Sequence, residues 1–344
     1  MISPTMSMNL SQNNFWKSLD RPIKVLAPMA GYTDSAFRQI CRKFGADVTI
    51  TELISADAIF YKHKNWYQDE KGVWQSRKEK DDTLQLLQFS DSERPLVVQL
   101  FGKHPEKFAE ATKWITQNLK PDGIDINMGC PARKVVGSDH GAALMKYPDL
   151  AIEIVKAVKE NTDLPVSVKT RLGWDNPDQI LEFAPVLYKA GIDAIIIHGR
   201  TYKQGFKGTA DWDNIYKVKE MLPDLVVIGN GGVKSISDIQ DSSVSAGPSP
   251  DGRFNIQLDG FAIGQAAFGR PWIFSKGELN QSELKTLILH HAKLADKNKG
   301  DFGLIEFRKH LLKYLSNFPG AKALRSQAVK IEKISDIETL IGSL

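Results

Sequence analysis

The chain has 344 residues, of which 42% are hydrophobic and 25% are charged, so it has the length for two folded domains. This composition excludes a disordered, collagen-like or disulfide-rich protein. No apolar run approaches the roughly 18 residues of a membrane span, and the first 20 residues lack the basic start and apolar core of a signal peptide. Two cysteines cannot form a disulfide framework, so we expect a cytoplasmic protein that contacts no membrane.

The net charge of +4 is unevenly distributed along the chain. Of the 45 basic and 41 acidic residues, 11 and 7 lie within residues 281–344, which leaves 34 of each elsewhere. All the excess positive charge therefore belongs to the last 64 residues. This segment is either a solvated helical surface or a docking surface for a polyanion such as nucleic acid.

Eight short apolar runs predict the strands of a parallel sheet. They are continuously apolar instead of alternating with polar residues, as expected for strands that are buried on both faces. The predicted strands cover residues 23–27, 48–52, 96–101, 123–127, 165–170, 194–198, 225–229 and 260–264.

Helical segments separate these strands. In residues 35–44, the side chains of Phe37, Ile40, Cys41 and Phe44 form one apolar stripe. Further helices are predicted over residues 106–118, 150–161, 179–190 and 212–221, with Asp149 as the N-cap of the second of these. Eight strands alternating with helices predict a (β/α)8 TIM barrel, whose usual size of ~250 residues fits this region. The alternative, a doubly wound open sheet, lacks the GxGxxG sequence after its first strand.

Three segments depart from this alternation. Residues 53–95 are too long for a simple strand–helix unit and predict an inserted hairpin or extra turn, whereas residues 242–257 are rich in Ser, Gly and Pro and predict a loop. From residue 281 onward only helices are predicted, over 283–296, 304–317 and 321–333. The chain therefore divides into an N-terminal extension (1–22), a catalytic barrel (23–280) and a small all-α helical bundle (281–344).

The active site of such a barrel lies at the carboxyl ends of the strands. Glycine-rich ends after the seventh and eighth strands match the place where such barrels bind a phosphate through backbone N–H groups. The candidate site therefore consists of Pro28, Met29, Ala30, Gln99, Asn127, Cys130, Lys169, Arg171, His198, Arg200, Asn230, Gly231, Gly232, Gly264 and Gln265.

Cys130 is the residue of this set with the most distinctive chemistry. It follows a buried strand in a Gly-Cys-Pro turn and is either a small turn residue or an acid or nucleophile, whereas Cys41 belongs to a helical apolar stripe and is predicted to be core. Lys169 is open between an ion pair and a ligand contact, and His198 between a satisfied strand-end histidine and a ligand contact. The histidines and cysteines show no metal-ligand spacing, so no metal site is expected.

Several of these segments, taken in order, resemble the tRNA-dihydrouridine synthases, in particular the bacterial type labelled as nitrogen-regulation-like. The resemblance covers roughly residues 23–330 and rests on residues 27–34 (APMAGYTD), 127–131 (NMGCP), 137–145 (with GAALM), 168–174 (VKTRLGW), 198–201 (HGRT), 229–232 (GNGG), 264–272 (with GRPW), 308–310 (RKH) and 318–321 (FPGA).

The resemblance implies an FMN-dependent barrel followed by a helical tRNA-binding domain. The enzyme would reduce the C5=C6 bond of selected uridines in tRNA after NADPH has reduced the flavin, and would be a monomer. The resemblance casts Cys130 as the proton donor. It assigns to FMN the residues Pro28, Met29, Ala30, Gln99, Asn127, Lys169, His198, Asn230, Gly231, Gly232, Gly264 and Gln265.

Uracil chemistry is consistent with these assignments. C6 is the electrophilic end of the double bond, so hydride from flavin N5 should add there, and an acid must then protonate C5. A thiol with an ordinary pKa of about 8.5 is protonated at neutral pH and can be that acid. A cation such as Lys169 would stabilise negative charge on the flavin. Arg171, Arg200, Lys285, Lys293, Arg308, Lys309, Lys313 and Arg325 are the candidate tRNA contacts.

Two positions depart from the family pattern. Gly232 stands where an acidic residue is frequent, and Gln265 stands where arginine is frequent in the phosphate loop, so Arg270 is a candidate to replace the missing cation. Two alternatives stay open: a barrel oxidoreductase acting on a small molecule, of the dihydroorotate dehydrogenase or ene-reductase kind, and a non-catalytic RNA-binding regulatory protein.

Overall fold

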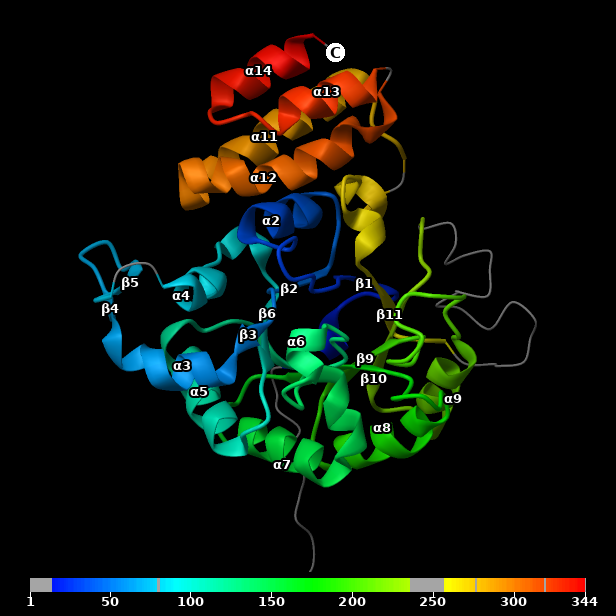
Figure 1. The fold of residues 1–344 in the computed structure, drawn as a ribbon. Helices are drawn as coiled ribbons and strands as arrows, with labels where there is room; N and C mark the ends of the chain where they lie inside the picture. Colours follow the sequence, from blue (N-terminus) through cyan, green and yellow to red (C-terminus); the bar gives the residue numbers. More distant parts are fainter. Residues whose placement is uncertain (1–13, 79–80, 236–256, 276, 319, 344) are drawn as a thin grey trace, which may run out of the picture.

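The structure is a computed structural model, which describes residues 14–78, 81–235, 257–275, 277–318 and 320–343. Its centre is a closed barrel of eight parallel strands, as predicted (Figure 1). Each strand pairs with its neighbours in chain order, and pairing of β2 with β6 and of β1 with β11 closes the ring. The barrel strands are β1 (Ile23–Leu26), β2 (Val48–Ile50), β6 (Leu96–Phe101), β7 (Gly123–Met128), β8 (Val166–Arg171), β9 (Ala194–His198), β10 (Val226–Asn230) and β11 (Gly260–Ile263).

Helices cover the outside of the barrel and connect consecutive strands. They are α2 (Ser35–Lys43), α5 (Pro105–Asn118), α7 (Pro148–Lys159), α8 (Gln179–Lys189) and α9 (Asp213–Met221). The predicted start of α7 is wrong: Pro148 is its first residue and Tyr147 is the N-cap, so Asp149 lies inside the first turn. Proline suits this first position because the N–H that it lacks would have no partner within the helix.

The interior of the barrel is filled by small and branched side chains from β1, β2, β6, β9, β10 and β11. Trp16, on the short helix α1 (Phe15–Ser18), joins this interior cluster and is fully buried. The ring of Phe15 lies beside Gly123, the first residue of β7. The segment before β1 therefore closes the amino-terminal end of the barrel, so a ligand site is left to the opposite end.

The region between β2 and β6 contains the predicted hairpin. Its elements are β3 (Ile54–Ser55), α3 (Ala56–Lys62), the antiparallel pair β4 (Trp66–Gln68) and β5 (Trp74–Ser76), and α4 (Asp82–Leu87). Trp66 and Trp74 both pack against Trp114 of α5, with ring centroids 4.7 and 5.0 Å apart, so the hairpin is fixed to the barrel's helical layer. The other irregular segment, residues 242–257, lies outside the described residues except for its last one.

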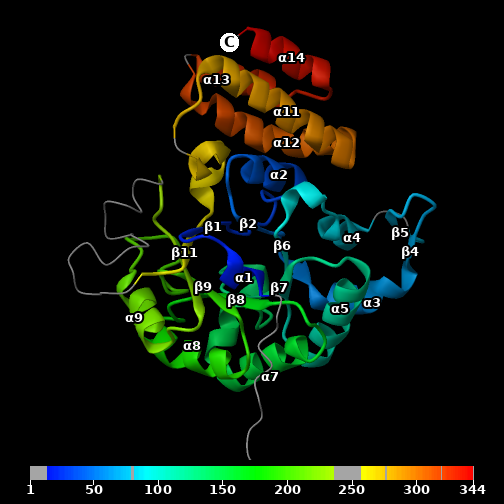
Figure 2. The same cartoon turned by 180° about the vertical axis from the view of Figure 1, so that it is seen from behind.

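The C-terminal helices form a second core. They are α11 (Gln281–Lys299), α12 (Asp301–Tyr314), α13 (Ala321–Ala328) and α14 (Ile334–Gly342). The helix predicted over 321–333 begins at the predicted residue but ends at Ala328, and α14 was not predicted. Their apolar side chains pack with Ala36 and Ile40 of α2 and with Trp272. Figures 1 and 2 show these helices stacked against α2 at one side of the barrel. Within the described residues, no helix has the length and apolar character to cross a membrane.

Candidate active site

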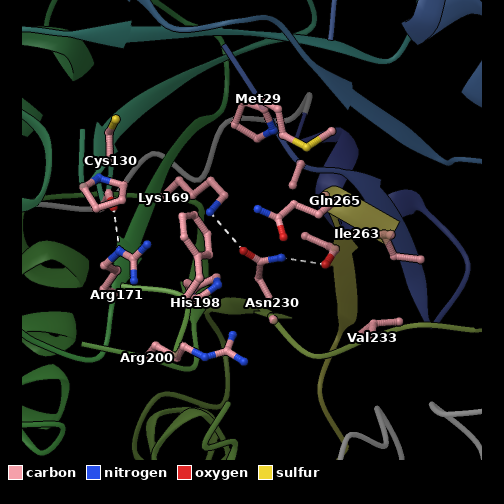
Figure 3. A pocket seen from close by; sticks show the side chains of 18 of the residues that line it. Met29, Cys130, Lys169, Arg171, His198, Arg200, Asn230, Val233, Ile263 and Gln265 are labelled. Atoms are coloured by element: carbon pink, nitrogen blue, oxygen red, sulfur yellow. Dashed lines mark hydrogen bonds between the residues drawn. The ribbon is translucent and has the colours of Figure 1, made fainter. Parts of the chain in front are cut away.

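A cavity of about 490 Å³ opens at the carboxyl ends of the barrel strands. In Figure 3, Cys130 and Arg171 lie on one side and Gln265 and Ile263 on the other, with Lys169, His198 and Asn230 between them. The cavity is lined by every residue predicted at the strand ends: Pro28, Met29, Ala30, Gln99, Asn127, Cys130, Lys169, Arg171, His198, Arg200, Asn230, Gly231, Gly232, Gly264 and Gln265.

Cys130 is half-buried in the turn that follows β7. Its backbone N–H donates to Oδ1 of Asn127 (3.0 Å), and its carbonyl accepts from the N–H of Ala142 (3.2 Å). The thiol is thus carried by a backbone segment that is held on both sides. Cys41, in contrast, is fully buried in the core, as predicted, and burial raises the pKa of its thiol well above the ordinary value.

Lys169 lies on β8 and reaches across the cavity floor. Its Nζ donates to Oδ1 of Asn230 (3.1 Å), and Nδ2 of Asn230 donates to the carbonyl of Ala262 (2.7 Å). Burial and the nearby Arg171 guanidinium lower the pKa of Lys169 to about 8, against the opposing influence of Asp125. The ammonium is therefore largely charged at neutral pH. Within the described residues it makes a single hydrogen bond to the protein, which leaves donors for a ligand.

His198 ends β9 beside three cationic side chains. Burial, then Lys169, Arg171 and Arg200, lower the pKa of His198 to about 2, so the ring is neutral at physiological pH. Among the described residues, its buried Nδ1 has no hydrogen-bond partner. A buried polar atom without a partner costs about 1–3 kcal/mol, so this nitrogen is suited to contact a ligand that enters the cavity.

The loop after β10 approaches His198 closely. Gly231 has φ +107°, and a Cβ there would lie 3.2 Å from Cβ of Ala210 and 3.3 Å from Nε2 of His198. The Trp212 indole N–H donates to the Gly231 carbonyl (3.0 Å), and this hydrogen bond holds the loop in place. A glycine-rich turn held in this way can present backbone N–H groups to an anion.

Arg171 and Arg200 both serve the loop that follows β9. Arg171 is almost fully buried, donates to the carbonyls of Gly129, Thr201 and Gly205, and lies under the ring of Phe206 at 5.6 Å. The Arg200 guanidinium donates to the carbonyls of Lys207 and Gly208. Both arginines thus shape the wall of the cavity in addition to lining it.

Sequence reasoning missed several cavity residues. Tyr32 and Phe206 come from loops, and their exposed rings line the opening. Lys234 also lines the cavity, whereas Arg270 does not: it pairs with Glu278 and donates to the Lys234 carbonyl (3.2 Å). The prediction that Arg270 replaces the missing phosphate-loop cation is therefore wrong, since its guanidinium is engaged elsewhere.

The basic side chains of the C-terminal helices are placed in different surroundings. Lys309 and Lys313, on α12, lie over the rings of Tyr32 (5.7 Å) and Phe268 (5.6 Å), close to the cavity opening. Arg308 donates to the carbonyl of Ile331 (2.7 Å), which ties α12 to the segment after α13. Lys293 faces Glu338 at 4.0 Å; Lys285 on α11 and Arg325 on α13 complete the predicted set.

One group of side chains within the described ranges has the composition of a metal site. The ligand atoms of Asp34, His291 and His310 lie within 4.8 Å of one another, between α2, α11 and α12. Asp34 already caps α2 by accepting the N–H of Phe37 (2.9 Å), and Nδ1 of His291 contacts the Tyr314 hydroxyl (3.0 Å). Among the described residues, Nε2 of His291 and both ring nitrogens of His310 are buried without a hydrogen-bond partner. The absence of a metal site stays a prediction.

The fold and the cavity define a barrel protein with a ligand site at the carboxyl ends of its strands. The model of the family "Dihydrouridine synthase (Dus)" matches residues 25–341. A "Probable tRNA-dihydrouridine synthase" of Aquifex aeolicus is 33% identical over 91% of this chain and 93% of its own length. A "tRNA-dihydrouridine synthase B" of Pseudomonas syringae pv. tomato is 34% identical, with 90% and 87% covered. The chain belongs to the dihydrouridine synthase family.

A solved structure supports the fold independently. A 2-naphthoyl-CoA reductase complex superposes with a TM-score of 0.51 at 12% identity, over 73% of this chain and 49% of that one. At this identity the similarity concerns the barrel architecture alone. Family membership, in turn, makes the chain an enzyme of a flavin-dependent oxidoreductase family and confirms the predicted resemblance.

Proposed function

We propose that this chain is an FMN-dependent tRNA-dihydrouridine synthase that uses NADPH to reduce uridines in tRNA. The proposal rests on family membership together with a half-buried thiol that lines the same cavity as a lysine, a histidine and a glycine-rich loop. A cytoplasmic monomer whose partners are tRNA and NADPH belongs to the same proposal.

The cavity has the features that a flavin nucleotide requires. Its volume of about 490 Å³ lies within the range of small-molecule sites. The unpartnered Nδ1 of His198 and the loop at Gly231 offer polar contacts beside three cations, as a phosphate would need. Lys169 and Asn230 offer donors on the cavity floor for the ring system, and Gln265 takes the place of the cation that related phosphate loops carry.

When bound, the flavin supplies the hydride that adds to C6 of the uracil. The residues of this chain have three tasks around that transfer. Lys169 holds positive charge next to the ring system, and the neutral His198 contributes hydrogen bonds without moving a proton. Cys130 delivers the proton to C5, which completes the two-electron reduction and leaves a thiolate that recovers its proton from solvent.

The helical domain holds the tRNA while one nucleotide enters the cavity. A base must leave its stack to reach this site, at a cost of a few kcal/mol that is smallest in loops. Lys309 and Lys313 are the basic side chains of the predicted helical-domain set that lie on rings beside the cavity opening, so they are the main tRNA contacts of this proposal. The exposed rings of Tyr32 and Phe206 can stack on bases near the entering nucleotide.

Replacement of the thiol tests the function. In Cys130→Ala, we expect FMN content and flavin reduction by NADPH to match the parent, because the side chain takes no part in either. Oxidation of the flavin by unmodified tRNA should slow by about 10²–10⁴-fold, the usual contribution of a general acid. Rapid mixing without oxygen measures both steps, and Cys41→Ala controls for loss of a thiol.

Two outcomes would contradict the proposal. If Cys130→Ala oxidises with tRNA at the parent rate, the acid is another group. If the parent is reduced by NADPH but forms no dihydrouridine in tRNA, as measured by nucleoside mass spectrometry, the chain is an oxidoreductase for a different substrate.

A further inference from the structure

A chain of hydrogen bonds connects the barrel interior with the turn that carries Cys130. At one end, Oδ1 of Asn127 accepts the backbone N–H groups of Gly129 (3.2 Å) and Cys130 (3.0 Å). Nδ2 of Asn127 then donates to Oε1 of Gln99 (2.8 Å), and Nε2 of Gln99 donates to Oδ2 of Asp125 (2.7 Å). The other carboxylate oxygen, Oδ1, accepts the hydroxyl of Ser167 (2.6 Å).

The donors and acceptors along this chain can be assigned from its Cys130 end. Backbone N–H groups can only donate, so Asn127 must present its oxygen to the turn and its nitrogen to Gln99. Gln99 must then present its oxygen to Asn127 and its nitrogen to Asp125. The last group has to be an acceptor, and an ionised carboxylate accepts with both oxygens.

Asp125 occupies a place where it can act only through other residues. It is fully buried within β7 and does not line the cavity, whereas Gln99 and Asn127 do. A buried carboxylate is costly, so its presence needs partners and a reason. Ser167 and Gln99 are the hydrogen-bond partners of the carboxylate. Orientation of the Gln99 and Asn127 side-chain amides is a reason for the carboxylate to be there.

We propose that Asp125 is a positioning residue whose carboxylate orients the Gln99 and Asn127 amides and so holds Cys130 in place toward the substrate. The inference rests on the proposed function and adds to it a residue that touches neither substrate nor cofactor. Without an acceptor at this position, the Gln99 amide can reverse, the reversal passes to Asn127, and the turn loses the oxygen that accepts its two N–H groups.

The ionisation of Asp125 gives this arrangement a pH dependence. Burial raises the pKa of Asp125 to about 7, against hydrogen bonds from Ser167 and Gln99 and the charge of Lys169, which favour the carboxylate. Lys169 on β8 is the charged group that faces it. Protonation converts one carboxylate oxygen to a donor that competes with the Gln99 N–H, so the orienting effect should weaken as pH falls through this value.

Two substitutions at this position separate orientation from charge. Asp125→Ala leaves no acceptor, and we expect tRNA to oxidise the flavin about tenfold more slowly or worse, the effect of one unpaired buried donor. Reduction by NADPH should fall less than the tRNA step, because it does not use the thiol and is affected only through the Gln99 and Asn127 amides. Asp125→Asn has one oxygen for Gln99 and one nitrogen that can donate to Ser167 Oγ, like the protonated acid, so it should recover only part of the loss.

The second measurement needs neither tRNA nor flavin. Iodoacetamide alkylation of Cys130, followed by peptide mass spectrometry, should accelerate by about threefold or more in Asp125→Ala because the turn loses its anchor, and by less in Asp125→Asn, which keeps one acceptor for Gln99. The buried Cys41 in the same sample reports any general loosening of the fold. A merely structural role would expose both cysteines together.

The results that would overturn the proposal are distinct from those that would overturn the function. Parent-like alkylation and tRNA oxidation in Asp125→Ala, or an equal loss in Asp125→Asn, would refute the orienting role. If Asp125→Ala does not fold, Ser167→Ala decides: removing this donor raises the Asp125 pKa, so the acid limb of the tRNA step should move to higher pH, and an unmoved limb refutes the proposal. A parent that forms no dihydrouridine refutes the function, while alkylation still tests the positioning.

Discussion

Replacing Gly231 by alanine tests whether the loop after β10 is built for an anion. A side chain at φ +107° costs about 1–3 kcal/mol in backbone strain. The new Cβ would also lie 3.2 Å from Cβ of Ala210 and 3.3 Å from the His198 ring, closer than ordinary contact, so the loop or His198 must move. If the shift displaces the phosphate contacts, about 1.4–2.8 kcal/mol of binding is lost, and the Kd for FMN should rise about 10–100-fold.

The assay is fluorescence titration of flavin-free Gly231→Ala with FMN, together with its thermal unfolding. Gly72→Ala is the matched control, because Gly72 has φ +74° in the β4–β5 hairpin and no atom would lie within 4 Å of its new Cβ. Both variants should lose stability, but only Gly231→Ala should lose affinity. Equal Kd values for Gly231→Ala and the parent would show that the flavin does not depend on this loop.

Two further predictions concern charge. Lys309→Gln combined with Lys313→Gln should weaken tRNA binding and lower the slope of log Kd against log salt by about two, with FMN content unchanged. Lys156→Gln, on the outer helix α7, is the control. An unchanged slope in the double variant would show that α12 is not part of the RNA-binding surface. The pKa of His198 is near 6.5 in the unfolded chain but about 2 in the folded protein, so the unfolded chain binds the extra proton as pH falls. Between pH 7.5 and 5.5, the free energy of unfolding of the flavin-free parent should therefore fall by roughly 1 kcal/mol more than that of His198→Asn. Urea unfolding at both pH values measures this, and an equal fall in the two proteins would contradict it.

The barrel could be predicted from the sequence because its strands are buried on both faces. A run such as Ala194–His198 is apolar up to its last residue, and its bounds in the structure match the prediction. The C-terminal helices were harder, since apolar spacing continues from α13 into α14 and no Gly or Pro marks the break. The break is made by Asp336, whose carboxylate accepts the N–H groups of Glu332 and Lys333 and starts a new helix there.

The site residues at or near the carboxyl ends of the strands could be predicted, whereas the buried Asp125 and the loop residues Tyr32 and Phe206 could not. Cys130 and Lys169 line the cavity as expected from their position at strand ends. Asp125 does carry a sequence signal, because it lies two residues before Asn127 in an otherwise apolar run and hence on the same side of β7. The positions of Tyr32 and Phe206 depend on loop paths, which periodicity does not determine.

The packing between the two domains would align a tRNA with the cavity if α12 binds it as proposed. A Cβ on Gly269 would lie 2.5 Å from Cβ of Lys313, so the barrel loop after β11 and α12 approach each other closely enough to require glycine. On the same side, the Tyr32 ring lines the cavity, packs edge-on against Phe268 at 4.4 Å and lies under the Lys309 ammonium. Cations that would hold the RNA backbone and the wall that would admit its base are therefore in direct contact with each other.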